Sequence, residues 1–364
     1  MDLQRRKGST GFGADRGPVI TAALDKMTIT QLPLSIIAAV AAAMLSAGIT
    51  WAIRPLLLLH ALARPNARSS HRIPTPQGAG IAVIGATLTV AGAVVAWADT
   101  AHLNIPAAIF AATLFIAAVG FADDVKSIQV LPRLMLQAVA VGAILFTAPS
   151  DLRIVPVCPL WIERGLLLLA GLWFVNLVNF MDGLDWMTVA EVVPVTGAIV
   201  LFGWLGEFPA SATIVAAALC GAMLGFAPFN RPVAKIFLGD VGSLPIGLLL
   251  GWCLLQLAWH QQFVAALLLP LYYLSDATVT LLRRMARREP FWAAHRTHFY
   301  QRATDNGFAV WRVVSEVFLL NIVLAALAIG SIITRSAAVE ILFLIAGGVA
   351  TGSVMYRFSR PRPS

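Results

Sequence analysis

Five aspartates lie at the ends of long apolar stretches of this chain: Asp123, Asp124, Asp182, Asp185 and Asp240. Their placement is conspicuous because the chain is 59% hydrophobic and has only 18 acidic residues. Two like charges about 4 Å apart repel by roughly 4 kcal/mol at an effective dielectric of about 20, and several such pairs would rival the stability of a domain. If the five side chains converge, a bound cation or protons must be part of the site.

The elements that position these aspartates are predicted to be membrane-spanning helices. The mean hydropathy is +0.81 and only 12% of the residues are charged, while apolar stretches of about 18 residues or more recur along the chain. We therefore expect an all-α polytopic membrane protein, and a soluble core is strongly disfavoured. About eleven spans are expected, near residues 33–53, 79–98, 104–121, 130–148, 165–180, 187–204, 210–228, 243–259, 262–282, 311–333 and 338–356.

Short loops between these spans indicate one compact membrane domain, residues 33–356, without a soluble appendage. Residues 1–32 are expected to form an N-terminal tail, either disordered or preceding a native start at Met27. Residues 357–364 are expected to form a basic cytoplasmic tail. The three cysteines are scattered without CxxC spacing, so neither a disulfide framework nor a zinc site is expected.

Lys and Arg residues are concentrated in alternate loops, which predicts the orientation of the chain. By the positive-inside rule the basic loops face the cytoplasm. Most of the 26 Lys and Arg residues lie there, whereas the opposite loops contain only Arg153, Arg164 and Arg335. All five aspartates fall on the basic side. The net charge of +8 therefore fits inner-leaflet lipid and anionic substrates better than nucleic acid.

The first acidic motif, GFADDVK at residues 120–126, joins the end of an apolar helix to two adjacent carboxylates. Neighbouring residues on a helix point about 100° apart. One carboxylate of the pair can therefore bind a metal ion while the other contacts the substrate. An ordinary solvated turn is the alternative for an isolated pair of aspartates.

The second motif, NLVNFMDGLD, spaces its polar residues three apart, at Asn176, Asn179, Asp182 and Asp185. On a continuous helix they would form one polar stripe. Such a stripe is costly against lipid and suits a polar ligand. Hydrogen bonds between helices are the alternative for the two Asn residues, and Gly183 would allow a turn that ends the stripe.

The third motif, FNRPVAKIFLGDVGS at residues 229–243, combines a glycine-containing turn with an acid, a base and an aromatic residue. Asp240 lies between two glycines, which permit close backbone approach. Lys235 offers a point charge to phosphate, and Phe237 offers a face on which a base can stack. We expect the next helix to begin at Ser243, with free N–H groups that favour phosphate.

The longest basic loop, residues 283–311, contains the motif AHRTHFYQR. If this segment is helical, His295 and His298 share one face, and His298 lies beside Arg302. Two His residues without a third ligand make a weak zinc site, so phosphate binding is favoured, with a basic patch on anionic lipid as the alternative. Asp276, which precedes the loop, is expected to pair with an arginine, or else to join the acidic site.

Taken in order and on one membrane face, GFADDVKS, NLVNFMDGLDWM, FNRPVAKIFLGDVGS and AHRTHFYQR resemble the motifs of the polyprenyl-phosphate N-acetylhexosamine-1-phosphate transferases, glycosyltransferase family 4. The similarity covers roughly residues 50–305. The basic loop at residues 68–80 is similar to the loop of this family that contains Pro, Thr and glycines. The His motif is closer to the O-antigen initiating branch than to the peptidoglycan branch.

This resemblance implies that an N-acetylamino-sugar 1-phosphate is transferred from a UDP-sugar to undecaprenyl phosphate, with release of UMP. The reaction would be the first step of O-antigen or other cell-envelope polysaccharide assembly, at the cytoplasmic face of a bacterial inner membrane. Mg²⁺ is the implied cofactor, with Mn²⁺ as an alternative, and a homodimer is a further expectation. The sequence does not name the sugar, because GlcNAc, QuiNAc, FucNAc and GalNAc differ only by the presence or configuration of a hydroxyl.

Motif position implies three groups of site residues. The catalytic group is Asp123, Asp124, Asp182, His295 and His298. The metal-binding pair is Asp240 and Asp182. The substrate-binding group is Asn176, Asn179, Asp185, Asn230, Lys235, Phe237, Arg296 and Arg302, of which Asn230 and Phe237 would hold the uracil. Two residues depart from the family pattern: Trp186 stands where a Gly is usual, and Lys126 lies nearer the acidic pair than in some relatives.

The chemistry of phosphate bears on the mechanism and on the rival function. A phosphate monoester has a second pKa of about 6, so the lipid phosphate is mostly ionised at neutral pH and has little need of a general base. Positioning by Asp123 or Asp124 is favoured, and a two-step route through an aspartyl-phosphate is left open.

The rival function is a cation-coupled transporter, because intramembrane acids often mark ion paths. Against it, the acids gather at cytoplasmic span ends, and we find no internal repeat.

Overall fold

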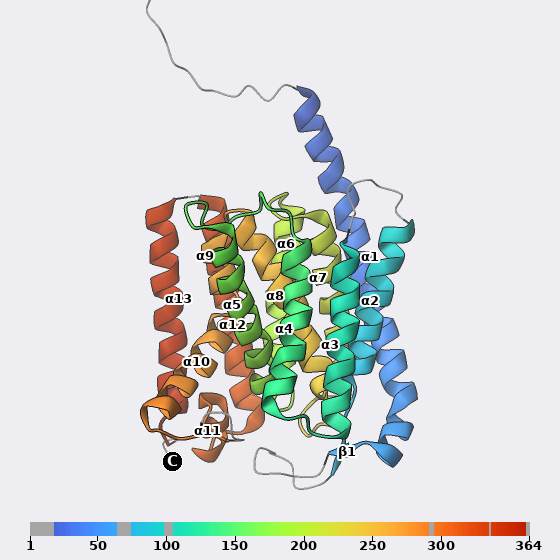
Figure 1. The fold of residues 1–364 in the computed structure, drawn as a ribbon, viewed down its shortest axis with the longest axis vertical. Coiled ribbons are helices and arrows are strands. Elements are labelled where there is room, and N and C mark those ends of the chain that lie inside the picture. The colour runs from blue at the N-terminus through green and yellow to red at the C-terminus, as the bar shows by residue number, and fades with distance from the viewer. Residues whose placement is uncertain (1–17, 64–73, 98–104, 291–294, 335, 362–364) are drawn as a thin grey trace, which may run out of the picture.

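The computed structural model describes residues 18–63, 74–97, 105–290, 295–334 and 336–361, with side chains of the first helix described from Leu32. The chain forms a bundle of upright helices with a small strand pair at one end (Figure 1). Its helices are α1 (Pro18–His60), α2 (Gly80–Trp97), α3 (Ala107–Val125), α4 (Val130–Thr147), α5 (Leu160–Met181), α6 (Met187–Trp204), α7 (Ala210–Phe226), α8 (Asp240–Trp259), α9 (Phe263–Leu268), α10 (Leu271–Ala286), α11 (Phe299–Asp305), α12 (Val310–Thr334) and α13 (Ala337–Phe358). The predicted all-α membrane architecture is confirmed.

Nine helices in the described part of the chain are long and apolar enough to cross a membrane. The apolar helix α7, with 17 residues, falls just below that length. The prediction of one continuous span over residues 262–282 is wrong, because the chain divides there into α9 and α10 at Pro270. Proline lacks a backbone N–H, and its ring clashes with the preceding helical turn. With this segment divided in two, the elements match the eleven expected segments.

The ends of the chain differ from the expected domain boundaries. α1 begins at Pro18, so residues 18–32 do not belong to a disordered tail as predicted. The helix continues through Pro33 and Pro55, although proline lacks a backbone N–H. The rest of the predicted tail, residues 1–17, lies outside the described residues. At the other end α13 continues to Phe358, just past the expected boundary.

Small residues allow α1 and α7 to pack with their backbones in close contact. A Cβ atom added at Gly221 would overlap the carbonyl oxygen of Ala39, and one added at Gly225 would overlap that of Ala43. The two glycines are four residues apart and therefore lie on one face of α7. Close backbone approach of this kind is a common way for helices to associate in a membrane, where apolar burial gives little driving force.

The N-terminal end of α8 is held by a second set of close backbone contacts. A Cβ at Gly80 in α2 would overlap the Cα of Gly242, and a Cβ at Gly120 in α3 would overlap the carbonyl oxygen of Asp240. Three helices therefore meet with almost no side chain between them. This junction lies beside the acidic residues of α3 and α8, so it determines how closely their carboxylates approach.

A strand pair closes the same end of the bundle. β1 (Leu62–Ala63) pairs antiparallel with β2 (Thr75–Pro76). The backbone N–H groups of Gly78 and Ala79 then donate to the carbonyl oxygen of Phe237, at 3.1 and 3.0 Å. The loop that follows β2 thereby holds the segment leading into α8.

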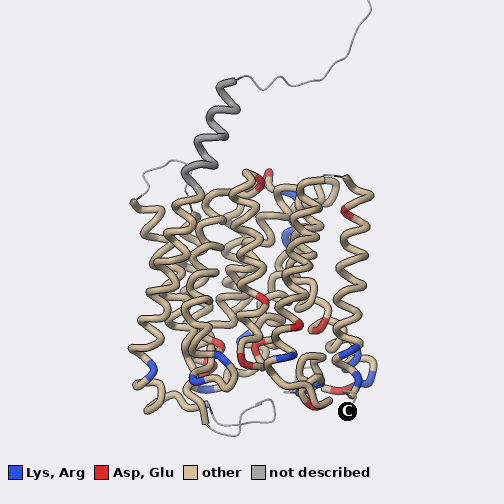
Figure 2. Tube along the Cα trace, turned by 180° about the vertical axis from the view of Figure 1, so that it is seen from behind, with Lys and Arg blue, Asp and Glu red and all other residues tan. Residues whose placement is uncertain are grey.

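Charged residues are distributed unevenly along the bundle. Figure 2 shows most of the described Lys and Arg residues at the end that carries the C-terminus, together with a group of Asp and Glu residues. The side of the bundle between its ends is almost free of charge. The predicted gathering of acids and bases at one end is therefore confirmed for the described residues.

We expect substitution of Gly221 by Leu to destabilise the bundle, because the new side chain must force α7 away from the carbonyl of Ala39. Overpacking of this kind costs about 1–3 kcal/mol or more. Thermal unfolding of the detergent-solubilised protein should show a lower midpoint. Gly48→Leu is the matched control, because a Cβ at Gly48 meets no atom within 4 Å. Equal midpoints for the two variants would contradict the close packing of α1 and α7.

Candidate active site

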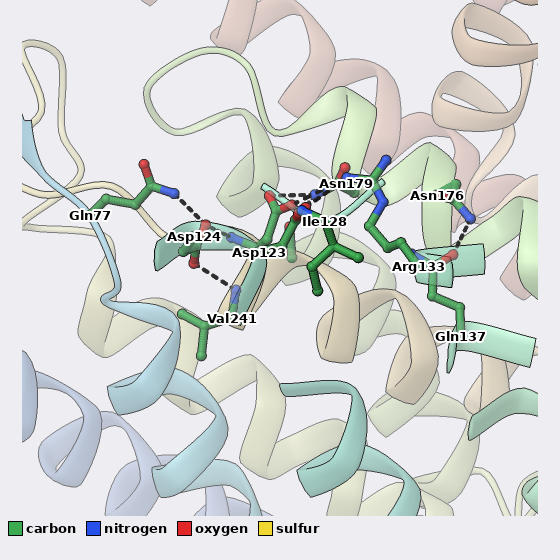
Figure 3. Close-up of polar contacts among 11 residues, drawn as sticks. Gln77, Asp123, Asp124, Ile128, Arg133, Gln137, Asn176, Asn179 and Val241 are labelled. Carbon is green, nitrogen blue, oxygen red and sulfur yellow. Dashed lines mark hydrogen bonds and ion pairs between the residues drawn. The ribbon is translucent and has the colours of Figure 1, made fainter. Parts of the chain in front are cut away.

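Asp123 lies in the last turn of α3 and is held by an arginine of α4. Its Oδ2 is 2.7 Å from Nη1 of Arg133, and its Oδ1 accepts a 2.6 Å hydrogen bond from the backbone N–H of Ile128 (Figure 3). The same Nη1 lies 3.9 Å from Oδ2 of Asp240. Arg133 therefore places one positive charge between two carboxylates of different helices and offsets part of their repulsion.

Asp124 caps the N-terminus of α8. Its carboxylate accepts the backbone N–H groups of Asp240 at 2.9 Å and Val241 at 3.0 Å, and also the side-chain amide of Gln77 (Figure 3). A carboxylate at this position satisfies donors that a helix leaves unpaired and interacts favourably with the helix dipole. Asp124 thus joins the end of α3 to the start of α8.

The prediction that α8 begins at Ser243 with free N–H groups is wrong. The helix begins three residues earlier, at Asp240. Its first two N–H groups donate to Asp124, and those of Gly242 and Ser243 donate to the carbonyl oxygen of Gly239. The N-terminus of α8 therefore has no unpaired donor left for phosphate.

Asn179 of α5 brings a third helix to the acidic pair. Its Nδ2 donates to Oδ1 of Asp240 at 2.7 Å and to the hydroxyl oxygen of Ser243 at 2.9 Å. The side chain of Asp240 is 27% exposed, compared with 7% for Asp123. Among these carboxylates Asp240 is the more open one, so it is better placed to receive a ligand from solution.

Asp182 follows the last residue of α5, where the predicted polar stripe ends. The helix ends at Met181, and a Cβ added at Gly183 would overlap the hydroxyl of Tyr300. Oδ1 of Asp182 accepts a hydrogen bond from the hydroxyl of Thr188. Burial raises the pKa of Asp182 to about 6, with smaller contributions from the nearby carboxylates of Asp124 and Asp185. Asp182 is therefore mostly ionised at neutral pH and takes up a proton as the pH falls through about 6.

Three residues predicted to bind substrate have hydrogen bonds within the protein. Asn176 donates to Oε1 of Gln137 at 2.6 Å, away from the aspartates (Figure 3), so the alternative of an interhelical hydrogen bond holds for it. Asp185 is buried and accepts the backbone N–H of Ala234 at 2.9 Å. The amide of Asn230 bonds at both ends to backbone, namely the N–H of Trp186 and the carbonyl of Ile236.

These contacts tie the loop after α5 to the loop before α8. Asp185 and Asn230 shape that pair of loops, and their predicted contacts with the nucleotide sugar stay predictions. Trp186, at the position where the family pattern has Gly, adopts φ 63°, in the left-handed region that glycine favours. Its indole N–H donates to the carbonyl oxygen of Ala227, which helps to hold this conformation.

Lys235 and Phe237 lie on the loop that leads to Asp240. Lys235 is exposed, so its ammonium group is available to an anion. Phe237 is half-buried; its backbone N–H donates to the carbonyl of Pro76 in β2, and its carbonyl accepts the N–H groups of Gly78 and Ala79. The contact of Lys235 with phosphate and the stacking of Phe237 on a base both stay predictions.

The two histidines come together although they do not share a helix face. Residues 295–298 are not helical, and α11 begins only at Phe299. The rings of His295 and His298 nevertheless stack, with centroids 4.9 Å apart. Arg302 follows in the first turn of α11, where its backbone N–H donates to the carbonyl of His298 at 2.9 Å.

Asp276 of α10 is the residue that orients His298. Its Oδ1 lies 3.1 Å from Nδ1 of His298, and it also accepts the backbone N–H groups of Phe299 and Tyr300 at 3.0 and 3.1 Å. The preferred expectation of a pair with an arginine is wrong. The reason is local, because a fully buried carboxylate needs several donors and the start of α11 supplies them.

Arg296 is engaged next to this site. Its Nη2 lies 3.3 Å from the hydroxyl of Thr304 and 3.1 Å from Oδ1 of Asp305, both in α11. The guanidinium of Arg283 lies over the ring of Phe299, 4.6 Å from the centroid. These contacts attach the basic loop to the bundle, while phosphate binding by Arg296 and Arg302 stays a prediction.

Sequence reasoning missed three residues that position the predicted ones, Gln77, Arg133 and Thr188, and it named the wrong partner for Asp276. The positive-inside rule treats Arg133 only as a charge on the basic side. It follows Asp123 by 10 residues and lies at the start of the next helix. Thr188 begins the helix after the second motif. A buried Asp before a His-containing loop is a usable signal, since histidine ligands and catalysts commonly need an orienting carboxylate.

The donor set fits a divalent ion that is bound by few protein ligands. In the described part of the chain no three His, Cys, Asp or Glu residues are arranged as a complete metal site. Mg²⁺, however, is usually bound by one or two carboxylates together with water and substrate phosphates. The partly exposed carboxylate of Asp240 suits such a site, and Asp182 stays a predicted second ligand.

Comparison with known proteins found a matching family model and similar sequences. The family model for glycosyl transferase family 4 matches residues 106–258, which include Asp123, Asn179 and Asp240. Decaprenyl-phosphate N-acetylglucosaminephosphotransferase of Mycobacterium tuberculosis is 28% identical over 334 residues, covering 80% of this chain and 82% of the relative. Phospho-N-acetylmuramoyl-pentapeptide-transferase of Limosilactobacillus fermentum is 29% identical over 160 residues, covering 44% and 49%. With the motif order and the membrane bundle, these matches support a polyprenyl-phosphate N-acetylhexosamine-1-phosphate transferase family, glycosyl transferase family 4.

Proposed function

We propose that the protein transfers an N-acetylamino-sugar 1-phosphate from a UDP-sugar to undecaprenyl phosphate and releases UMP. The observation that carries this proposal is the convergence of Asp123, Asp240 and Asn179, from three helices, at the basic end of the bundle. Such a set of oxygen donors beside cationic side chains suits phosphate chemistry, in which catalysis is mainly alignment and charge neutralisation.

Asp240 is proposed as the principal metal ligand, with Asp182 as the second. Mg²⁺, or Mn²⁺ in its place, would neutralise phosphate charge when bound there. Asp123, fixed by Arg133 and the N–H of Ile128, would align the lipid phosphate. Asp124 would act on the reaction through Asp240, because its own oxygens are bonded to the N-terminus of α8.

His298 is proposed to contact phosphate. Because Asp276 accepts a hydrogen bond from Nδ1, the other ring nitrogen of His298 is left for the ligand. His295 stacks on this ring and would extend the anion site, with Arg302 in the next turn. The exposed Lys235 adds a further cation on the neighbouring loop.

The proposed setting is the inner membrane of a bacterium, with the active site in the cytoplasm. The positive-inside rule supports this orientation, because basic residues and aspartates share one end of the bundle (Figure 2). The product would be a lipid-pyrophosphate-linked amino sugar, the first intermediate of O-antigen or other cell-envelope polysaccharide assembly. A panel of UDP-GlcNAc, UDP-QuiNAc, UDP-FucNAc and UDP-GalNAc, assayed with the purified protein, would identify the donor.

Replacement of Asp240 by Asn should abolish most UMP release from UDP-sugar, polyprenyl phosphate and Mg²⁺. A lost charge-neutralising ligand is expected to lower kcat by about 10²-fold or more. Asn176→Ala is the control, since Asn176 bonds to Gln137 and lies outside the acidic group. Near-normal activity of a folded Asp240→Asn protein would remove Asp240 from the metal-binding role.

Isotope exchange should separate the two chemical routes. If the lipid phosphate attacks directly, labelled UMP will not enter UDP-sugar unless the lipid acceptor or the lipid product is present. A covalent aspartyl-phosphate would allow exchange without lipid. We expect no exchange, because the oxygens of Asp123 and Asp124 are already bonded to Arg133 and to backbone N–H groups.

Asp276→Asn should lower kcat roughly 10- to 100-fold, because a hydrogen bond to a charged partner is lost from His298. The acidic limb of the pH–rate profile should also move, which a merely structural role would not produce. Thr280→Val is a suitable comparison, since it removes a different 3.3 Å contact of Asp276 and leaves His298 in place. An unchanged profile in a folded Asp276→Asn protein would exclude the orienting role.

A further inference from the structure

A second polar group lies inside the bundle, away from the aspartates at its end. Glu191 of α6 is 1% exposed, and its Oε2 accepts a 2.7 Å hydrogen bond from Nδ2 of Asn321 in α12. The same Nδ2 donates to the carbonyl oxygen of Ala190 at 2.9 Å, which settles the orientation of the amide. The reaction proposed above makes no use of Glu191.

The surroundings of Glu191 favour the neutral carboxylic acid. In the part of the chain that the structure describes, no Lys, Arg or His forms an ion pair with it, whereas the buried Glu163 is paired with Arg153 at 2.7 Å. The titratable neighbour of Glu191 is Tyr273, whose phenol carries no charge at neutral pH. A carboxylate buried with a single amide donor and no cation is strongly disfavoured, so the group keeps its proton.

Three buried polar atoms around this acid have no hydrogen-bond partner among the described residues. They are Oε1 of Glu191, Oδ1 of Asn321 and the hydroxyl of Tyr273. A protonated Oε1 supplies a donor, the amide oxygen is an acceptor, and the phenol can act as either. Buried atoms of this kind are normally satisfied by protein or by internal water, so internal water is the expected partner of these atoms.

Two adjacent tyrosines connect this group with the active site. Tyr272 and Tyr273 lie in the first turn of α10, and the hydroxyl of Tyr272 donates to Oδ2 of Asp276 at 3.2 Å. The hydroxyl of Tyr273 instead lies near Thr188 and within electrostatic range of Glu191 and Asp182. One turn of α10 therefore contacts both the carboxylate that orients His298 and the group that surrounds Asp182.

We propose that Glu191 is a proton-carrying neutral acid which shares bound water with Tyr273 and Asn321, and that this hydrated bridge positions α10 against α6. Through α6 the bridge holds Thr188 and hence Asp182. Through α10 it holds Tyr272 and hence Asp276 and His298. Glu191 is thus a positioning residue that touches no substrate.

Infrared difference spectroscopy of the purified protein tests the protonation of Glu191 without any substrate. Glu191→Gln should remove a carbonyl-stretch band of a protonated carboxylic acid. Glu163→Gln is the matched control, because its ion-paired carboxylate should contribute a carboxylate band instead. Tyr273→Phe should shift the acid band of Glu191, because one partner of the bridge is lost. An acid band unchanged by Glu191→Gln, or unmoved by Tyr273→Phe, overturns the proposal.

A kinetic comparison tests the positioning role, and this arm rests on the proposed transferase function. Glu191→Gln keeps a neutral donor and acceptor and should retain kcat within about twofold, whereas Glu191→Leu leaves Asn321 and Tyr273 unsatisfied and should lose about tenfold. Thermal unfolding of both variants checks that they fold. Equal activity of the two variants, or an equal loss in both, overturns the positioning role. If wild-type protein shows no transfer while the infrared result holds, the proposed function fails and the neutral acid stands.

Discussion

The carboxylate of Asp124 is the interaction on which the site depends. It accepts both leading N–H groups of α8 and thereby joins the end of one membrane helix to the start of another, 116 residues later in the chain. The contact is only geometrically accessible because Gly120 and Gly80 let the backbones of α3 and α2 approach α8. Asp240, the first residue of α8, consequently lies beside Asp123. Arg133 lies between the two carboxylates and offsets part of their repulsion.

Charge repulsion among the five aspartates is relieved by giving them different partners. Asp123 is paired with Arg133, Asp124 with a helix terminus, Asp182 with a threonine and Asp185 with a backbone N–H. Asp240 accepts a hydrogen bond from Asn179 and has a larger exposed side-chain fraction than Asp123. The arrangement is therefore a set of separate anchors around one open carboxylate, which leaves room for a metal ion to be completed by substrate phosphates.

The gathering of the motifs at one end could be predicted from sequence, because apolar length and loop charge together determine which loops share a membrane face. The family could be recognised as well, since four motifs stand in order. The partners of individual side chains could not be predicted. Asp185 and Asn230 bond to backbone groups that approach only in three dimensions, and Asp276 bonds to His298 because α11 begins beside α10.

Helix boundaries show the same limit of sequence reasoning. Hydropathy stays high across Pro270, so residues 262–282 resemble one span. The helix is nevertheless divided there, and α10, which contains Asp276, leads into the basic loop. In the same way glycines around Asp240 favour a turn, and only the contact with Asp124 shows that the helix has already begun.

The glycine junction at the start of α8 has a consequence for how donor specificity can diverge. At Gly80 and Gly120 even a methyl group would overlap backbone, so larger residues at these two positions would force the helices beneath the site apart. Under the proposed function, a change of sugar donor would then have to come from the loops between α5 and α6 and before α8. The glycine contacts of α2 and α3 with α8 leave little room for substitution, so library mutagenesis for a new donor is best confined to these loops.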